Sequence, residues 1–136
     1  MKLCNETITV FNKRLDPETG AYVYFPTVIT GASWYCEIAS AVDNSGLHAA
    51  DKFTIRIPVD ADFGGNEYVD AAEYKNADGV DGIFTLAQGD VVVKAAIEDQ
   101  MTLAQLHEQY SECCTILGVT DNRRAPNAPH FKVVGS

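Results

Sequence analysis

The closing stretch Val119–Ser136, VTDNRRAPNAPHFKVVGS, contains two β-rich runs separated by a loop with two prolines and two adjacent arginines. Each proline biases the residue before it toward extended backbone, which limits the conformations open to the loop. The stretch therefore predicts two strands joined by a stiff loop that presents Arg123 and Arg124. These arginines are candidates for contact with a partner surface. Local pairing with Asp121 inside the hairpin is the alternative.

The same β-rich character extends over most of the chain. Lys52–Ile57, for example, alternates polar and apolar residues with the period of a half-buried strand, and Pro26 is expected to end an earlier strand. Seven strands are predicted: Glu6–Phe11, Ala21–Phe25, Ala32–Ser40, Lys52–Ile57, Asp90–Ile97, Glu112–Thr120 and His130–Val134. This number at this spacing predicts a mainly β fold, a small antiparallel β-barrel or sandwich.

One short helix is expected among the strands. Thr102 and Gln105 form a capping-box pattern, and apolar residues that include Leu106 and Tyr110 follow at helical spacing. The pattern predicts a short helix at about 103–110 that covers an open edge or end of the sheet.

Residues 60–89 are the least regular part of the chain and are rich in acidic residues. A single helical turn is expected at Asp70–Tyr74. The stretch is too long for a simple connection, which is typical of a functional or mobile segment. We therefore expect residues 1–136 to form one β-rich domain with a long irregular acidic insertion at about 60–89.

The chain is acidic, with 19 Asp and Glu residues against 10 Lys and Arg residues and a formal net charge of −9. Residues 57–112 hold two lysines and twelve acidic residues, a net charge of −10. Binding to phosphates needs clustered Lys and Arg, so a nucleic-acid partner is not expected. No apolar run approaches the roughly 20 residues of a membrane helix, and no signal peptide is recognisable, so no membrane partner is expected either.

The four cysteines, Cys4, Cys36, Cys113 and Cys114, show no CxxC spacing. Neighbouring residues of a strand point to opposite faces, so Cys113 and Cys114 are poorly placed to bridge each other. Reduced, mostly buried thiols in a protein made in the cytoplasm are the expectation.

The acidic loop Asp60–Glu67 resembles a calcium-binding loop in one respect, because carboxylates at alternate positions can converge on a hard cation. Gly64 and Ala71 stand where an EF-hand needs ligands, so a turn with solvated acids is the preferred interpretation. The histidines are far apart in the sequence, which argues against a local zinc motif. No metal and no cofactor are expected.

No catalytic motif is present: the chain lacks GxSxG, a phosphate-binding glycine loop and a dinucleotide fingerprint. It is therefore not expected to be an enzyme, with a small enzyme kept as a remote alternative. Aromatic residues could form a sugar-stacking platform, although alternation with its neighbours places Trp34 in the core. The candidates are Tyr22, Tyr24, Trp34 and Tyr35. A calcium- or carbohydrate-binding β-module therefore remains an alternative.

Four segments, read in order, resemble one family of small structural proteins. They are TITVFNKRLDPETGAYVYFPTVITGASWYCEIA, FTIRIPVDADFGGNEYV, GDVVVKA and VTDNRRAPNAPHFKVVG, which together span most of the chain. The family is encoded in the head-to-tail region of tailed phages and prophages of Gram-positive bacteria. The resemblance implies a non-enzymatic virion protein, made in the cytoplasm of the bacterial host. It would be a head-tail connector, head-completion (neck) or minor capsid subunit.

Such subunits form rings with copies of themselves and contact portal or tail-completion proteins, as the resemblance implies. Neighbours in a ring meet through two different surfaces. Our candidates for these surfaces are the arginine loop and the acidic insertion, with site residues Arg123, Arg124, Asp60, Asp62, Asp78 and Asp81. Acidic residues facing a ring lumen would also repel DNA and let it pass, which is a second hypothesis for the four aspartates.

Overall fold

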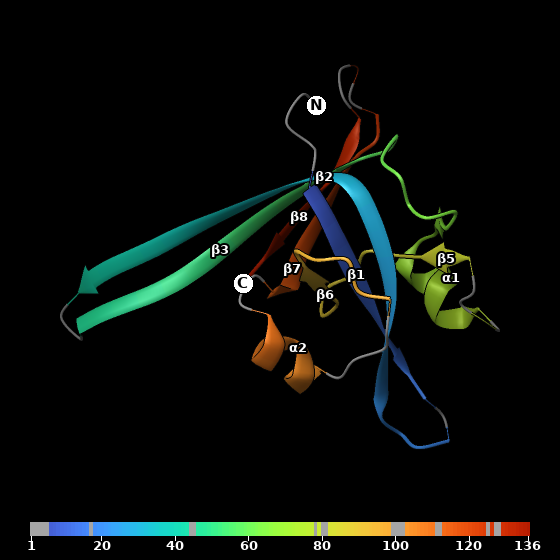
Figure 1. Ribbon diagram of the computed structural model, residues 1–136, viewed down its shortest axis with the longest axis horizontal. Helices are drawn as coiled ribbons and strands as arrows, with labels where there is room; N and C mark the ends of the chain where they lie inside the picture. Colours follow the sequence, from blue (N-terminus) through green and yellow to red (C-terminus); the bar gives the residue numbers. More distant parts are fainter. Residues whose placement is uncertain are drawn as a thin grey trace.

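The computed structural model describes residues 6–16, 18–43, 46–77, 79, 82–98, 103–110, 113–124, 126 and 129–136, with the backbone only at 36–43, 46–51, 103 and 107. Among these residues, six antiparallel strands form a closed barrel in the order β1-β2-β3-β8-β7-β6 (Figure 1). The barrel strands are β1 (Glu6–Leu15), β2 (Tyr22–Asp43), β3 (Gly46–Pro58), β6 (Val91–Val93), β7 (Cys113–Asn122) and β8 (His130–Gly135). The expected mainly β fold is confirmed.

The barrel has six strands where seven were expected, because Pro26 does not end a strand. β2 runs without a break from Tyr22 to Asp43, and Pro26 pairs with Phe11 of β1. Around Pro26, β2 pairs with β1, and its ladder with β3 begins later, at Ser33. A proline is tolerated there because no strand of the described residues pairs with the other side of β2 at Pro26 and needs its missing N–H.

Gly31 marks the point where β2 leaves β1 and begins to pair with β3. Glu6 pairs with Ala32 but Thr7 pairs with Thr30, so Gly31 is the extra residue of a β-bulge. Its φ of 100° lies in the region that favours glycine. A bulge bends a strand and increases its twist, which redirects β2 across the barrel.

β6 is shorter than expected and ends at Val93. Beyond it, the hydroxyl of Thr9 donates to the carbonyl of Ala95 at 2.6 Å and accepts from the backbone N–H of Ile97 at 2.9 Å. The hydroxyl thus takes the place of a ladder partner. The segment after β6 is held against β1 by a side chain and not by a strand pairing.

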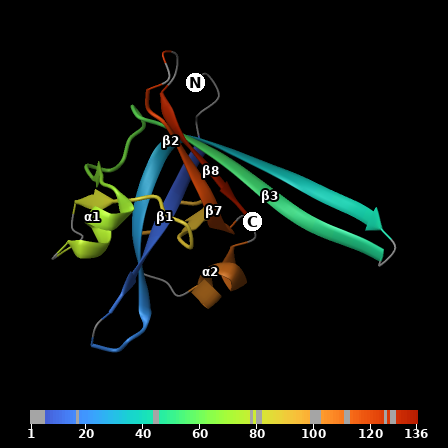
Figure 2. The same ribbon diagram turned by 180° about the vertical axis from the view of Figure 1, so that it is seen from behind.

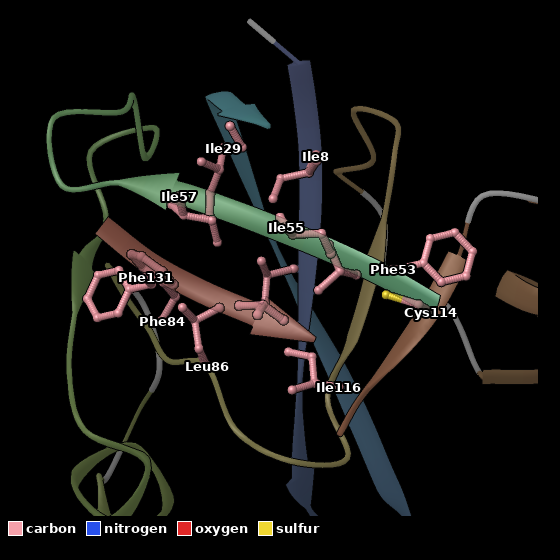
Figure 3. Packing of buried hydrophobic residues seen from close by; sticks show 14 residues of the cluster. Ile8, Ile29, Phe53, Ile55, Ile57, Phe84, Leu86, Cys114, Ile116 and Phe131 are labelled. Carbon is pink, nitrogen blue, oxygen red and sulfur yellow. The ribbon is translucent and has the colours of Figure 1, made fainter. Parts of the chain in front are cut away.

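The interior of the barrel is filled by apolar side chains from all six strands (Figure 3). The larger ones are Ile8, Ile29, Phe53, Ile55, Ile57, Ile116 and Phe131. Phe84 and Leu86, from the segment between β3 and β6, belong to the same cluster. Burying each large apolar side chain stabilises the fold by roughly 2 kcal/mol, so the inward faces of the strands determine the barrel.

A second apolar cluster lies outside the barrel wall, under the helix α2 (Leu103–Gln109). Leu106 is fully buried against Phe11, Val91 and Val93. The short helix is confirmed, but it covers a face of β1, β6 and β7 and not an edge or end of the sheet. The expected Thr102 cap lies outside the described residues.

Cys113 belongs to the outer cluster and Cys114 to the inner one, as expected for neighbours in a strand. Both are buried, and neither forms a disulfide. Cys4 and the side chain of Cys36 lie outside the described part of the chain.

The acidic insertion contains β4 (Glu67–Tyr68), α1 (Ala71–Asn76) and β5 (Ile83–Phe84). β4 and β5 form a small parallel pair, and the helical turn expected near Asp70–Tyr74 is α1. Phe84 packs its ring against Phe63 and Tyr68, with centroid distances of 5.1 and 5.8 Å. The insertion is therefore anchored in the barrel core by aromatic contacts.

The β2–β3 hairpin extends well beyond the barrel as an arm. The ladder of β3 with β8 begins only at Phe53, while β2 and β3 remain paired out to Asp43 and Gly46. Seven residue pairs, from Glu37–Lys52 outward, therefore have no third strand among the described residues. Both views show this arm projecting away from the rest of the molecule (Figures 1 and 2). Among the residues that the structure describes, no helix is long and apolar enough to span a membrane.

Candidate functional site

The arginine loop joins β7 and β8, as expected, and Arg123 is engaged within the hairpin. Its Nε lies 2.9 Å from both carboxylate oxygens of Asp121, and its Nη2 lies 2.7 Å from Oδ2. The guanidinium also lies over the rings of Tyr68 and Phe131, 5.2 Å from each centroid. Of the two interpretations, local pairing with Asp121 is the one that the structure contains. Arg124 is exposed on the same loop.

The Asp121–Arg123 pair is exposed, with about half of each side chain accessible to solvent. Hydrogen bonds from the Arg123 side chain lower the pKa of Asp121. Exposed pairs of this kind contribute little to stability because water and salt screen them. The pair orders the loop more than it stabilises the barrel.

The acidic loop Asp60–Glu67 is tied to the barrel by its backbone. Asp62 and Thr30 exchange two backbone hydrogen bonds of 2.9 Å, and the carboxylate of Asp62 accepts from the N–H of Gly64 at 2.9 Å. Asp60 and Glu67 are exposed. The loop is therefore a fixed turn with carboxylates directed to solvent.

Other predicted residues are not brought together. Asp78 and Asp81 lie outside the described residues. Within the part of the chain that the structure describes, no three His, Cys, Asp or Glu side chains are grouped to hold a metal ion.

The aromatic residues proposed for sugar stacking do not share a surface. Tyr22 and Tyr35 are exposed, but they lie thirteen positions apart along β2, or roughly 40 Å at the rise of a strand. Trp34 is half-buried, with its ring edge-on to Phe53 at 5.2 Å. Trp34 thus packs against the main core, and the tyrosines form no platform with it.

A cleft that sequence reasoning missed lies between the β1–β2 hairpin, α1 and residues 85–90. Its volume is about 950 Å³, near the upper end of the range for ligand pockets. Three of the ten Lys and Arg residues of the chain line it: Lys13, Arg14 and Lys75. On a chain with a net charge of −9, this is a concentration of positive charge.

The cationic side chains are held differently. The Lys13 ammonium lies 4.6 Å from the centroid of the Tyr22 ring, and Arg14 donates a hydrogen bond to the carbonyl of Ala77. Lys75 is exposed on α1. Lys13 and Arg14 are therefore positioned by neighbours, whereas Lys75 is accessible from solvent.

The floor of the cleft is a buried polar network around Asp90, which is 3% exposed. One carboxylate oxygen accepts from the backbone N–H of Lys13 at 2.9 Å. The other accepts from the Asn12 amide at 2.9 Å and from the N–H of Ala87 at 3.2 Å. Asn12 also bonds the backbone of Thr85 in both directions, at 2.6 and 3.1 Å. The network fixes β1 against the segment that leads into β6.

Burial raises the pKa of Asp90 to about 6, although its three hydrogen bonds and the nearby Lys13 act in the opposite direction. The other carboxylate lining the cleft, that of Asp16, accepts the N–H of Glu18 at 3.0 Å. Both carboxylates thus have hydrogen-bond donors within the chain. The three cationic side chains therefore determine the charge that the cleft presents to solvent.

Only some of the residues that line this cleft could have been singled out from the sequence. Lys13 and Arg14 stand together at the end of a β-branched run, and Asp90 directly precedes three valines. Lys75 lies 61 positions after Arg14 and belongs to a helix of six residues. Nothing local connects it to the other two cations.

The fold and these surfaces define a mainly β protein with a closed six-stranded barrel in its described residues, a projecting arm and a basic cleft. The chain belongs to a family of unknown function, DUF6751, whose model matches residues 3–136. No curated protein and no solved structure matches it. The family assigns no chemistry to the cleft or to the arm.

Proposed function

We propose that this protein is a non-enzymatic structural subunit of a tailed-phage virion, a head-tail connector, neck or minor capsid protein that acts by protein–protein assembly. Its partners would be copies of itself in a ring and neighbouring portal or tail-completion proteins. The observation that carries the proposal is the β2–β3 arm.

An isolated two-stranded hairpin is marginally stable in water. The arm has seven residue pairs without a third strand in the described residues, so its outer edges present unpaired N–H and C=O groups. Such edges are templates for pairing with another chain. A subunit that docks its arm on a neighbour would satisfy these groups and gain a contact at a distance from its own barrel.

Two further observations support the proposal. The resemblance to phage head-to-tail proteins extends along most of the chain, and a β-barrel is the fold that this resemblance implies. The insertion is strongly acidic, so its surface is complementary in charge to a basic surface on a neighbouring subunit.

The direct test is the composition of the particle. Mass spectrometry of virions purified from the phage or prophage that encodes this chain should detect it. The genome of that phage should also hold a portal gene upstream of this chain's gene and a tail gene downstream. Absence of the chain from virions that are otherwise complete would overturn the proposal.

Removal of the arm tests the observation that carries it. Residues 38–51 would be replaced by Asn-Gly, which favours a tight hairpin between Glu37 and Lys52. Since the arm pairs with no barrel strand in the described residues, the barrel should keep its cooperative unfolding. Copurification with the portal protein and ring formation in electron micrographs should be lost.

The matched control is E98A/E108A, at two exposed glutamates outside both the arm and the cleft. This change should leave assembly intact. Normal assembly of the arm deletion would contradict the role given to the arm.

A further inference from the structure

We propose that the basic cleft between the β1–β2 hairpin and α1 binds the acidic loop Asp60–Glu67 of a second copy of this chain. This inference rests on the proposed function and deepens it, because it names the two surfaces that meet when copies assemble. It also assigns Asp60 to a subunit contact and not to a ring lumen.

The first support is charge complementarity. The cleft is lined by Lys13, Arg14 and Lys75, while its two carboxylates accept hydrogen bonds from within the chain. Asp60 and Glu67 are exposed on the acidic loop, and none of the hydrogen bonds or ion pairs resolved for the described residues involves either carboxylate. The cleft therefore offers cationic side chains, and the loop offers exposed carboxylates that could pair with them.

The second support is the apolar part of the two surfaces. Leu15 and Tyr22, which face each other across the β1–β2 ladder and line the cleft, are 52% and 56% exposed. Val59, directly before the acidic loop, is 39% exposed. Contact between these side chains would remove apolar surface from water on both partners.

The third support is the rigidity of the loop. Asp62 bridges Thr30 through two backbone hydrogen bonds, and the N–H of Val59 donates to the carbonyl of Pro129 at 3.2 Å. A loop already fixed in one conformation loses little entropy on binding.

The contact is between copies and not within one chain. In both views the segment that follows β3 starts near the upper end of the barrel, whereas the tip of the β1–β2 hairpin lies at the lower end (Figures 1 and 2). Two different surfaces that match each other make a heterologous contact. Repeated from subunit to subunit, such a contact closes into a ring when the rotation permits.

Charge reversal on both sides provides the test, with sedimentation velocity of the full chain as the measurement. The cleft variant is K13E/K75E, which spares Arg14 because Arg14 bonds the backbone of Ala77. The loop variant is D60K/E67K, which spares the turn-forming carboxylate of Asp62. We expect each variant alone to associate about tenfold more weakly than the wild type, or worse, because like charges then face each other.

An equimolar mixture of the two variants should recover association. The acidic loop of the cleft variant meets an unchanged cleft, and the basic loop of the other variant meets a reversed, acidic one. The matched control for the loop variant, E98K/E108K, makes the same change of net charge as D60K/E67K at two other exposed glutamates and should associate like the wild type.

The outcomes separate this inference from the proposed function. Association that survives K13E/K75E, a mixture that recovers nothing, or a control that weakens association equally would each overturn the inference. Wild-type protein that stays monomeric at about 1 mM, the range of very weak complexes, would overturn it too. Detection of the chain in virions tests the proposed function and does not depend on any of these association measurements. If K13E/K75E fails to unfold cooperatively, K75E alone replaces it, since Lys75 is exposed.

Discussion

Asp90 and Asp121 are both hydrogen-bonded carboxylates beside a cationic side chain, but one is buried in the barrel wall and the other is exposed. Asp90 accepts hydrogen bonds from residues as far as 78 positions away, whereas Asp121 binds Arg123, two positions along the chain. Burial raises the pKa of Asp90 to about 6, and hydrogen bonds from Arg123 lower the pKa of Asp121.

The difference shows that an ion pair that is obvious in the sequence need not be the one that matters to the fold. The exposed pair keeps its water and contributes little when formed. The buried carboxylate has given up its water, so each of its donors and acceptors depends on the others. We expect mutations at the two sites to differ accordingly.

Asp90→Ala should have the largest effect, a loss of about 3 kcal/mol in the free energy of unfolding. The substitution leaves three donors, on Asn12, Lys13 and Ala87, without their acceptor at a position that is 3% exposed. Urea titration with a two-state fit measures it. Asp121→Ala is the matched control and should cost less than about 1 kcal/mol. Equal losses at the two sites would contradict the prediction that the buried carboxylate contributes more to stability than the exposed one.

The pH dependence should have opposite signs at the two sites. The pKa of Asp90 is about 6 in the folded state against 3.8 for the ordinary group, so the folded state holds this proton more tightly. The stabilising contribution is complete below the ordinary pKa and is lost as pH rises through 6, about 3 kcal/mol in total. Asp121, with a lowered pKa, loses its small contribution as pH falls.

Urea titrations between pH 4 and 7 would measure this contribution as the difference between the wild type and Asp90→Asn. The free energy of unfolding of the wild type should fall relative to the variant as pH rises. Parallel profiles for the two proteins would show that Asp90 titrates as in an unfolded chain.

Arg123→Ala should have the smallest effect, below about 1 kcal/mol. The substitution removes an exposed ion pair and the contact of the guanidinium with Tyr68 and Phe131, but it creates no buried vacancy. A cycle with Asp121→Ala, followed by thermal or urea unfolding, measures the coupling energy. A coupling above about 2 kcal/mol would mean that the pair is part of the core, contrary to its exposure.

Much of the fold could be predicted because alternation along a strand is a local property. The inward residues of β3, such as Ile55 and Ile57, were readable from the sequence, and so was the placement of Cys113 and Cys114 on opposite faces. The strand break at Pro26 could not be judged in the same way. Whether a proline is tolerated depends on the absence of a neighbouring strand on one side, which is a property of the sheet.

The candidate site was predicted less well. Arg123 and Arg124 were placed correctly on a loop between two strands, but the sequence left open whether Arg123 would pair locally. The cleft was missed because its cations come from β1 and from α1, which are about sixty residues apart. The residues that fix its floor, Asn12 and Asp90, become neighbours only when β1 pairs with β6.

Residue pattern alone was enough to establish a mainly β chain, its turn-linked runs, its acidic insertion and its short helices, because these depend on period, turn chemistry and charge within a few residues. Closure of the barrel, the free length of the β2–β3 arm and the basic cleft were decided by tertiary structure. Each of these depends on which distant strands become neighbours, and that is settled by the joint burial of the inward faces of all six barrel strands described.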